Sequence, residues 1–151
     1  MSDEQKETLL RVQNGLYHLQ RGLYPFVEQH MANRHGAKWL HYASRAAGSG
    51  PNDGLDAYGL VKTMLDNWRE VFDEAFPFRE KHNARRYASA ALMARNAVSH
   101  NVGSLPDSDA LSYLDQILRL LKVTQAPSGD VEAVQKLYDE QRRCGIVPET
   151  T

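Results

Sequence analysis

Apolar side chains recur every three or four positions along most of the chain, which is the period of an α-helix rather than of a strand. The first such segment predicts a helix from Glu4 to about Gly22. Its apolar face consists of Leu9, Val12, Leu16, Leu19 and Leu23. Pro25 then allows a kink or a fresh helix start, and the apolar pattern continues through Phe26, Val27 and Met31 to Gly36.

The middle of the chain holds one clear loop and the strongest helix pattern. Residues 43–54 contain three glycines and a proline among small polar residues, so they interrupt any regular element. Leu55 to Phe76 is predicted to be a helix that Pro77 ends. Its wide apolar stripe is Tyr58, Val61, Met64, Leu65, Trp68, Val71, Phe72 and Ala75.

Three more helices are predicted in the C-terminal half. The first is rich in alanine, runs from about Asn83 to Ser99, and would let another helix approach closely. The second starts near Ser104–Asp107, with Pro106 in its first turn, and the third has Ser128 as its cap and stops at Gly145. The fold class is therefore an all-α bundle of about five helices. We expect a single domain over residues 1–151, with N-terminal helices (1–42), a loop (43–54) and a core (55–145).

Composition narrows the class of protein. With 151 residues, 42% of them hydrophobic and 25% charged, the chain has the size and composition of one globular domain. A net charge of −1 argues against a broadly basic nucleic-acid binder, and the single cysteine, Cys144, cannot form an internal disulfide. The polar N-terminus and the lack of a long apolar run predict a cytoplasmic protein without a membrane partner. The ending Pro-Glu-Thr-Thr is compatible with a linker into further domains.

Charge is unevenly distributed along the chain. From Pro77 to His100, five basic side chains and one acidic side chain give +4; from Asn52 to Phe76, six acidic and two basic side chains give −4. The basic segment could bind a phosphate backbone, with Lys81, Arg85 and Arg86 as candidate contacts. The alternative is that the two segments attract one another across a solvated face.

Within the basic segment, Arg95 and His100 are separated by four residues. A histidine can transfer a proton from or to a ribose hydroxyl, a guanidinium can hold the phosphate, and Asn96 could orient either group. Positions five apart lie about 140° apart on an ideal helix, so we expect the pair to converge only where the helix ends. The other interpretation of His100 is a helix-terminal histidine that interacts with the helix dipole.

The motif and its context resemble the HEPN superfamily of small all-α domains. Arg-Asn-x-x-x-His ends an alanine-rich helix here, and the preceding segment Leu55–Phe72 resembles the subgroup first described in a yeast endoribonuclease of transcript surveillance. The resemblance covers roughly Leu55 to Val123, and Val98 stands where that subgroup has an aromatic residue. It implies a homodimeric, metal-independent endoribonuclease without a cofactor, which leaves a 2′,3′-cyclic phosphate and is associated with phage defence or toxin systems. Arg95, Asn96 and His100 would be its catalytic residues.

Two other functions are alternatives to the nuclease. The first is a non-catalytic module that dimerises or joins a larger defence assembly through the alanine-rich helix. If the protein is a nuclease, a further regulatory partner could restrain it. A helix-turn-helix DNA binder is disfavoured, because no tight helix-turn-helix spacing is evident. We expect no metal site, because His30, His35 and His41 have spacings that do not return to one helix face and are expected at the surface.

Overall fold

A computed structural model describes residues 2–45, 54–100 and 105–144, and within these ranges every regular element is helical. The all-α prediction is therefore confirmed. The α-helices are α1 (Asp3–His35), α2 (Ala57–Asp66), α3 (Phe78–His100), α4 (Asp107–Val123) and α5 (Ser128–Cys144). Shorter pieces are two 3₁₀ segments, η1 (Gly36–Tyr42) and η3 (Asp73–Ala75), and one π-helical turn, η2 (Trp68–Phe72). No helix in the described part of the chain is both long and apolar enough to cross a bilayer.

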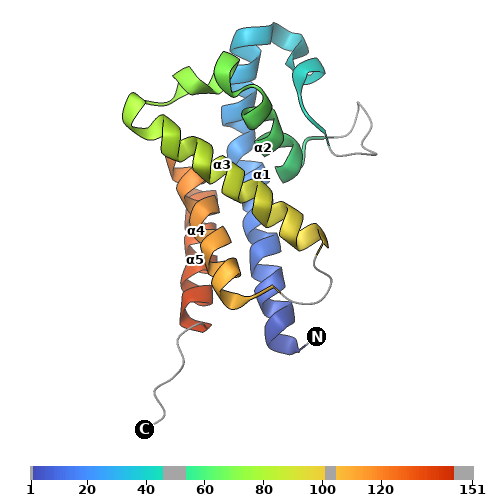
Figure 1. The fold of residues 1–151 in the computed structure, drawn as a ribbon, viewed down its shortest axis with the longest axis vertical. Helices are drawn as coiled ribbons and strands as arrows, with labels where there is room; N and C mark the ends of the chain where they lie inside the picture. The colour runs from blue at the N-terminus through green and yellow to red at the C-terminus, as the bar shows by residue number, and fades with distance from the viewer. Residues whose placement is uncertain (1, 46–53, 101–104, 145–151) are drawn as a thin grey trace.

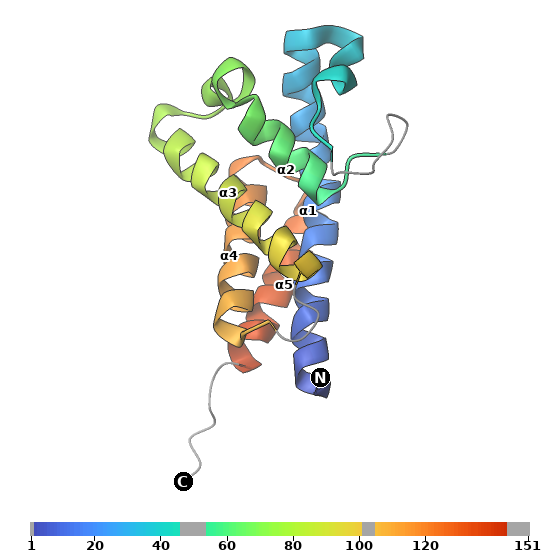
Figure 2. The same ribbon diagram turned by 45° about the vertical axis from the view of Figure 1, so that its right-hand side comes forward.

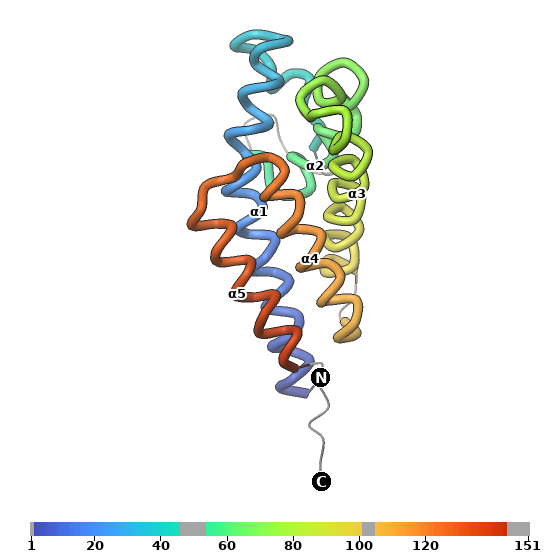
Figure 3. The backbone as a smooth tube through the Cα atoms, turned by 90° about the vertical axis from the view of Figure 1, so that its left-hand side faces the viewer, coloured from blue at the N-terminus to red at the C-terminus, as the bar shows by residue number. Residues whose placement is uncertain are grey.

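The long helix α1 is the axis of the molecule. Helices α4 and α5 run along its lower half, while α2 and η1 lie beside its upper half (Figures 1 and 2). Helix α3 crosses this bundle diagonally and packs most extensively on α4. A view from the side places α3 and α5 at opposite edges of the molecule, with α4 between them (Figure 3).

Of the two possibilities that Pro25 allowed, a kink or a fresh helix start, the fresh start does not occur. The helix continues through it to His35. A proline inside a helix costs about 3 kcal/mol. Leu23, Val27 and Met31 are fully buried around it, and each contributes roughly 1.5–3 kcal/mol when buried. Burial of the continuous apolar face therefore outweighs the lost hydrogen bond.

The predicted helix from Leu55 to Phe76 is real only in its first half. The α-helical part, α2, ends at Asp66, and the chain then forms the π turn η2. In this turn the Val71 and Phe72 amides both donate to the Asn67 carbonyl, at 2.9 and 3.4 Å. The wider turn keeps Trp68 and Phe72 buried. Helix α3 then begins at Phe78, five residues earlier than predicted, because the Pro77 carbonyl accepts hydrogen bonds from the amides of Glu80 and Lys81.

Two later boundaries also differ from expectation. Helix α4 begins at Asp107, with Pro106 as its N-cap residue instead of in its first turn, and α5 begins at Ser128 itself. The residues predicted to interrupt or end helices at 101–104 and at Gly145, and the loop residues 46–53, lie outside the described residues.

Helices α1 and α4 approach closely at two glycines of α1. A Cβ atom at Gly15 would lie 2.8 Å from Leu114 Cδ2, and one at Gly22 would lie 2.8 Å from Leu121 Cδ2. Gly15 and Gly22 are seven residues apart, as are Leu114 and Leu121, so two leucines of α4 fit over two glycines of α1. This contact fixes α4 against the axis of the molecule.

Gln125 holds the turn between α4 and α5 in a left-handed conformation, with φ of 56°. The Ala126 amide donates to the Leu121 carbonyl (2.9 Å) and the Gln125 amide to the Lys122 carbonyl (3.1 Å), which is the hydrogen-bond pattern of a Schellman C-cap. Glycine normally occupies this position, because a side chain is strained at positive φ.

We therefore expect Gln125→Gly to stabilise the protein by roughly 0.5–1 kcal/mol, despite the greater freedom of glycine in the unfolded chain. The measurement is the midpoint of urea unfolding, with Gln125→Ala as the control that keeps a Cβ atom. A midpoint that is lower for glycine than for alanine would contradict the assignment of strain to this residue.

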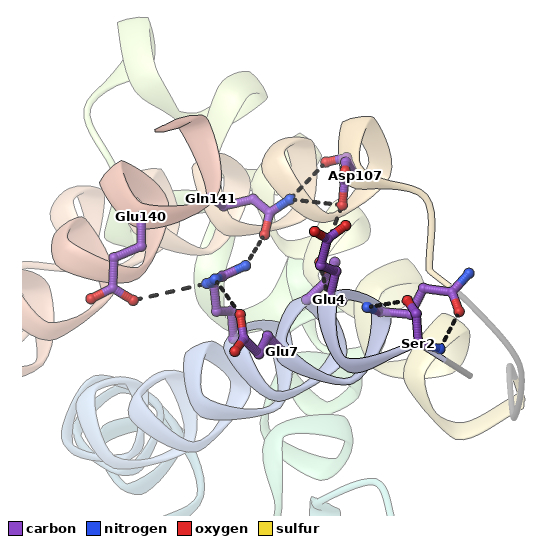
Figure 4. A network of polar contacts seen from close by, with 9 residues as sticks. Ser2, Glu4, Glu7, Asp107, Glu140 and Gln141 are labelled. Carbon is purple, nitrogen blue, oxygen red and sulfur yellow. Dashed lines mark hydrogen bonds and ion pairs between the residues drawn. The ribbon is translucent and has the colours of Figure 1, made fainter. Parts of the chain in front are cut away.

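A polar network joins α1, α4 and α5 at the end of the molecule that holds the N-terminus (Figure 4). The buried Gln141 side chain donates from Nε2 to the Asp107 Oδ1 and carbonyl oxygens, both at 3.3 Å, and accepts from Arg11 Nη1 at 3.0 Å. The Thr8 hydroxyl also donates to Asp107 Oδ1, at 3.1 Å. Three helices thus meet at the first residue of α4.

Candidate functional site

Helix α3 carries all the candidate site residues, and its two faces differ sharply. The face toward the bundle is made of small buried side chains: Ala84, Ala88, Ala91 and Ala94. The opposite face is exposed along the helix at His82, Arg86, Ser89, Met93 and His100. The alanine face lets α3 lie close on α4, as predicted, and leaves the polar face outside.

Arg95 and His100 do not converge within one copy of the chain. His100 is the last residue of α3 and is still helical, so on an ideal helix the two side chains point about 140° apart. Their Cα atoms are also separated by about 7.5 Å along the axis. His100 is exposed and Asn96 is half-buried between the two directions. One copy therefore offers the two groups of the motif on different sides of α3.

Arg95 lies against α2. Arg95 is half-buried, and its guanidinium carbon is 4.7 Å from the centroid of the Tyr58 ring, within the range of a cation–π interaction. Tyr58 comes from the first turns of α2 and is itself half-buried. The contact with the ring therefore restricts where the guanidinium lies.

The three predicted phosphate contacts have different surroundings. Lys81 forms an ion pair with Asp73, with Nζ 3.4 Å from Oδ2, and its Nζ also lies 5.0 Å from the centroid of the Phe78 ring. The guanidinium of Arg85 lies 5.9 Å from the centroid of the buried Trp68 ring. Arg86 is exposed on the outer face.

The attraction between the acidic and basic segments is limited to one ion pair. Among the described residues, Lys81–Asp73 is the single salt bridge between the segment ending at Phe76 and α3. Arg85 and Arg95 contact aromatic rings of the acidic segment instead of its carboxylates. Most of the basic charge of α3 is therefore not neutralised by the neighbouring helix.

Tyr58 and Trp68 were not predicted as part of the site. Trp68 was predicted to lie on the apolar stripe of its helix, and it is buried and stacked on Phe76, with ring centroids 5.6 Å apart. Its second contact, with Arg85, was missed. The sequence spacing could have indicated these contacts. Tyr58 and Trp68 are ten residues apart, and so are Arg85 and Arg95, so two segments that pack antiparallel can form both aromatic–arginine contacts at once.

Tyr87 and Arg119 connect α3 with α4 on another side of the helix. The hydrogen bond between Arg119 and the Tyr87 side chain, followed by the interaction with Asp115, raises the pKa of Arg119 above its usual value. Tyr87 is half-buried and packs against the core. The Arg119 side chain therefore interacts with both Tyr87 of α3 and Asp115 of α4.

Of the three histidines expected at the surface, only His41 is exposed. His30 is half-buried against Phe26, with ring centroids 4.5 Å apart, and burial lowers the pKa of His30. His35 is half-buried and stacks on Tyr42, with ring centroids 3.9 Å apart. No three His, Cys, Asp or Glu side chains of the described ranges gather as metal ligands would.

Comparison with protein families supports the resemblance and extends it. The family described as Swt1-like HEPN matches residues 14–125. The match begins within α1, so it is wider than the segment from Leu55 to Val123 expected from the motif. The N-terminal helix is thus part of the family's domain. Comparison with curated proteins and with solved structures finds no match.

Proposed function

The chain belongs to the Swt1-like HEPN family, and from this premise we propose that it is a metal-independent endoribonuclease. The observation that carries the proposal is the exposed His100 at the end of a helix whose arginines are largely free of carboxylate partners. An exposed imidazole can accept and release a proton near neutral pH. The nearby arginines can neutralise a phosphate.

In the proposed reaction, the ribose 2′-oxygen attacks the adjacent phosphorus atom as its proton passes to a neutral His100. The bond from phosphorus to the 5′-oxygen then breaks, and a protonated histidine supplies the proton of the leaving 5′-hydroxyl. The products are a 2′,3′-cyclic phosphate and a 5′-hydroxyl. Arg95 stabilises the negative charge on the phosphoryl oxygens, and Asn96 orients the phosphate or the imidazole.

The divergence of Arg95 and His100 supports a homodimer as the active form. One copy directs the two groups about 140° apart, whereas two copies facing one another along α3 could supply a histidine and an arginine to the same phosphate. Phe78 and Met93, 86% and 62% exposed on α3, would be covered in such a contact.

The proposed role is in phage defence or a toxin-like system, and the proposed compartment is the cytoplasm, where the RNA substrate lies. We also propose that a regulatory partner or further domains restrain cleavage. The family resemblance supports all of these assignments.

The test is cleavage of a mixed RNA pool by the purified chain in the presence of a chelator. We expect cleavage to persist, because the proposed chemistry uses side chains alone, and the products to end in a 2′,3′-cyclic phosphate. Cleavage that stops on addition of chelator, or products with 3′-hydroxyl ends, would contradict the mechanism.

The second candidate is a non-catalytic module that dimerises or joins a larger assembly. It is favoured by the exposed Phe78 and Met93, because apolar side chains on a helix face are suited to contact another protein. A folded dimer that cleaves none of the pool would favour this function over the nuclease.

A further inference from the structure

The segment from α2 through η2 and η3 runs antiparallel to α3, and its contacts with α3 are nested in order. Tyr58 faces Arg95, Trp68 faces Arg85, and Asp73 faces Lys81. We call the line along which these pairs lie the α2–α3 seam. Its cations, Lys81, Arg85 and Arg95, all come from one side of α3.

The two arginines of the seam are held without being neutralised. In the part of the chain that the structure describes, neither guanidinium has a carboxylate within 4.0 Å, and each lies over an aromatic ring. The contact with the ring restricts the position of each guanidinium. Because no carboxylate of the described residues pairs with its N–H groups, they remain able to donate to another molecule. Two such N–H groups match two oxygens of one phosphate.

The spacing of the seam suits an extended chain of phosphates. Lys81 and Arg85 are about 6 Å apart along α3, and Arg85 and Arg95 about 15 Å apart, at 1.5 Å per residue. The row leads toward His100, at the C-terminal end of the same helix. A polyanion bound along the seam would therefore reach Arg95. The His100 side chain of the same copy points about 140° away from Arg95, so the histidine that acts on this strand would come from the second copy of the proposed dimer.

We propose that the α2–α3 seam binds the backbone of single-stranded RNA, and that Tyr58 and Trp68 are positioning residues that hold Arg95 and Arg85 for phosphate contact. This proposal rests on the proposed function. Trp68 is buried beneath Arg85 and acts as a platform, whereas the half-buried Tyr58 presents the arginine of the motif itself. Substrate affinity thus depends on aromatic side chains that are not expected to take part in proton transfer.

The test measures binding of a labelled, unstructured uridine oligonucleotide by fluorescence anisotropy, with His100→Ala in every protein so that cleavage does not consume the probe. Tyr58→Leu should weaken binding about fivefold, because Arg95 loses the ring that holds it, while Tyr58→Phe keeps the ring and should stay within about twofold. Arg95→Lys keeps the charge but loses the flat stacking group, and should resemble Tyr58→Leu.

The salt dependence of binding separates a phosphate contact from a general loss of charge or of fold. Arg85→Gln should lower the slope of log affinity against log salt concentration by about 0.7, the contribution of one phosphate of a single strand. The matched control is Lys136→Gln, which should leave the slope unchanged. Lys136 is an exposed residue of α5, and α5 lies at the opposite edge of the molecule from α3.

The outcomes separate the two proposals. If the parent protein binds the oligonucleotide and Tyr58→Leu, Arg95→Lys and Arg85→Gln all bind like it, the seam is not the RNA path, although the nuclease proposal stands. An equal loss of slope in Lys136→Gln would also overturn the seam. If the parent protein binds no RNA and the protein with His100 intact cleaves none, both proposals fail.

Discussion

Replacing His100 with alanine should lower RNA cleavage by about 100-fold or more, because the loss of a general acid–base group typically has an effect of 10²–10⁴. His100 is exposed at the last residue of α3, so its removal should not disturb packing. The helical signal in circular dichroism and the unfolding midpoint should match those of the unmodified protein. Cleavage rates under single-turnover conditions give the measurement.

His82→Ala is the matched control. His82 lies five helical turns before His100, and is therefore exposed on the same face of the same helix. We expect its substitution to change cleavage by less than about threefold, because a surface histidine away from the reacting phosphate contributes no proton transfer. If His100→Ala cleaves as fast as His82→Ala, the assignment of His100 as the acid–base group is wrong.

A mixing experiment extends this result to the proposed dimer. Arg95→Ala and His100→Ala should each be inactive alone, and a composite site predicts that mixing them restores part of the activity. A mixed dimer would contain one site with an intact histidine from one copy and an intact arginine from the other. If the mixture remains as inactive as its components although subunits exchange, the site is not shared in this way.

Gly22→Ala should destabilise the protein by about 2 kcal/mol. Alanine is a better helix former than glycine, so the intrinsic change would be favourable by up to about 1 kcal/mol. The new Cβ atom, however, would lie 3.2 Å from Ala126 Cβ and 3.3 Å from Asp130 Cβ, in addition to the 2.8 Å contact with Leu121. Cβ atoms move only with their backbone, so the start of α5 would have to shift, and overpacking costs about 1–3 kcal/mol.

Gly15→Ala tests whether crowding, and not the loss of glycine, is the cause. The Cβ atom there would meet Leu114 Cδ2 at 2.8 Å and Ile117 Cδ1 at 3.6 Å, both at the ends of flexible side chains. Repacking of those ends and the gain in helix propensity should nearly cancel, with a net change below about 0.5 kcal/mol. Urea unfolding provides both values, and equal destabilisation at the two positions would refute this account of the α1–α4 contact.

The helices were predictable from the sequence because their apolar faces follow a local rule, the 3.6-residue period. The errors occur where a non-local contact overrides that rule. Pro25 is carried through α1 by burial on both sides, and the π turn at Trp68–Phe72 keeps two large aromatic residues in the core. The pattern of apolar residues shows neither how much side-chain burial stabilises a helix around a proline nor where a π turn interrupts a helix.

The candidate site was predictable in its residue types but not in its geometry. The motif and the basic segment pointed to α3, and the structure describes all six candidate residues there. Their partners depend on the hairpin of α2 and α3, which brings residues nearly forty positions apart together, as in Tyr58–Arg95. The charge pattern suggested carboxylates of the acidic segment as one possible set of partners for the basic segment, whereas the fold places aromatic rings opposite two of its arginines.

The network around Gln141 has a consequence for local opening of the protein. Helix ends commonly fray independently, at little cost in free energy. Here the last turn of α5 is hydrogen-bonded to the first residue of α4, and the same carboxylate accepts from Thr8 of α1. Fraying of α5 would leave the Asp107 carboxylate without the Gln141 donor and Arg11 without its Gln141 acceptor, so these ends should open as one cooperative unit.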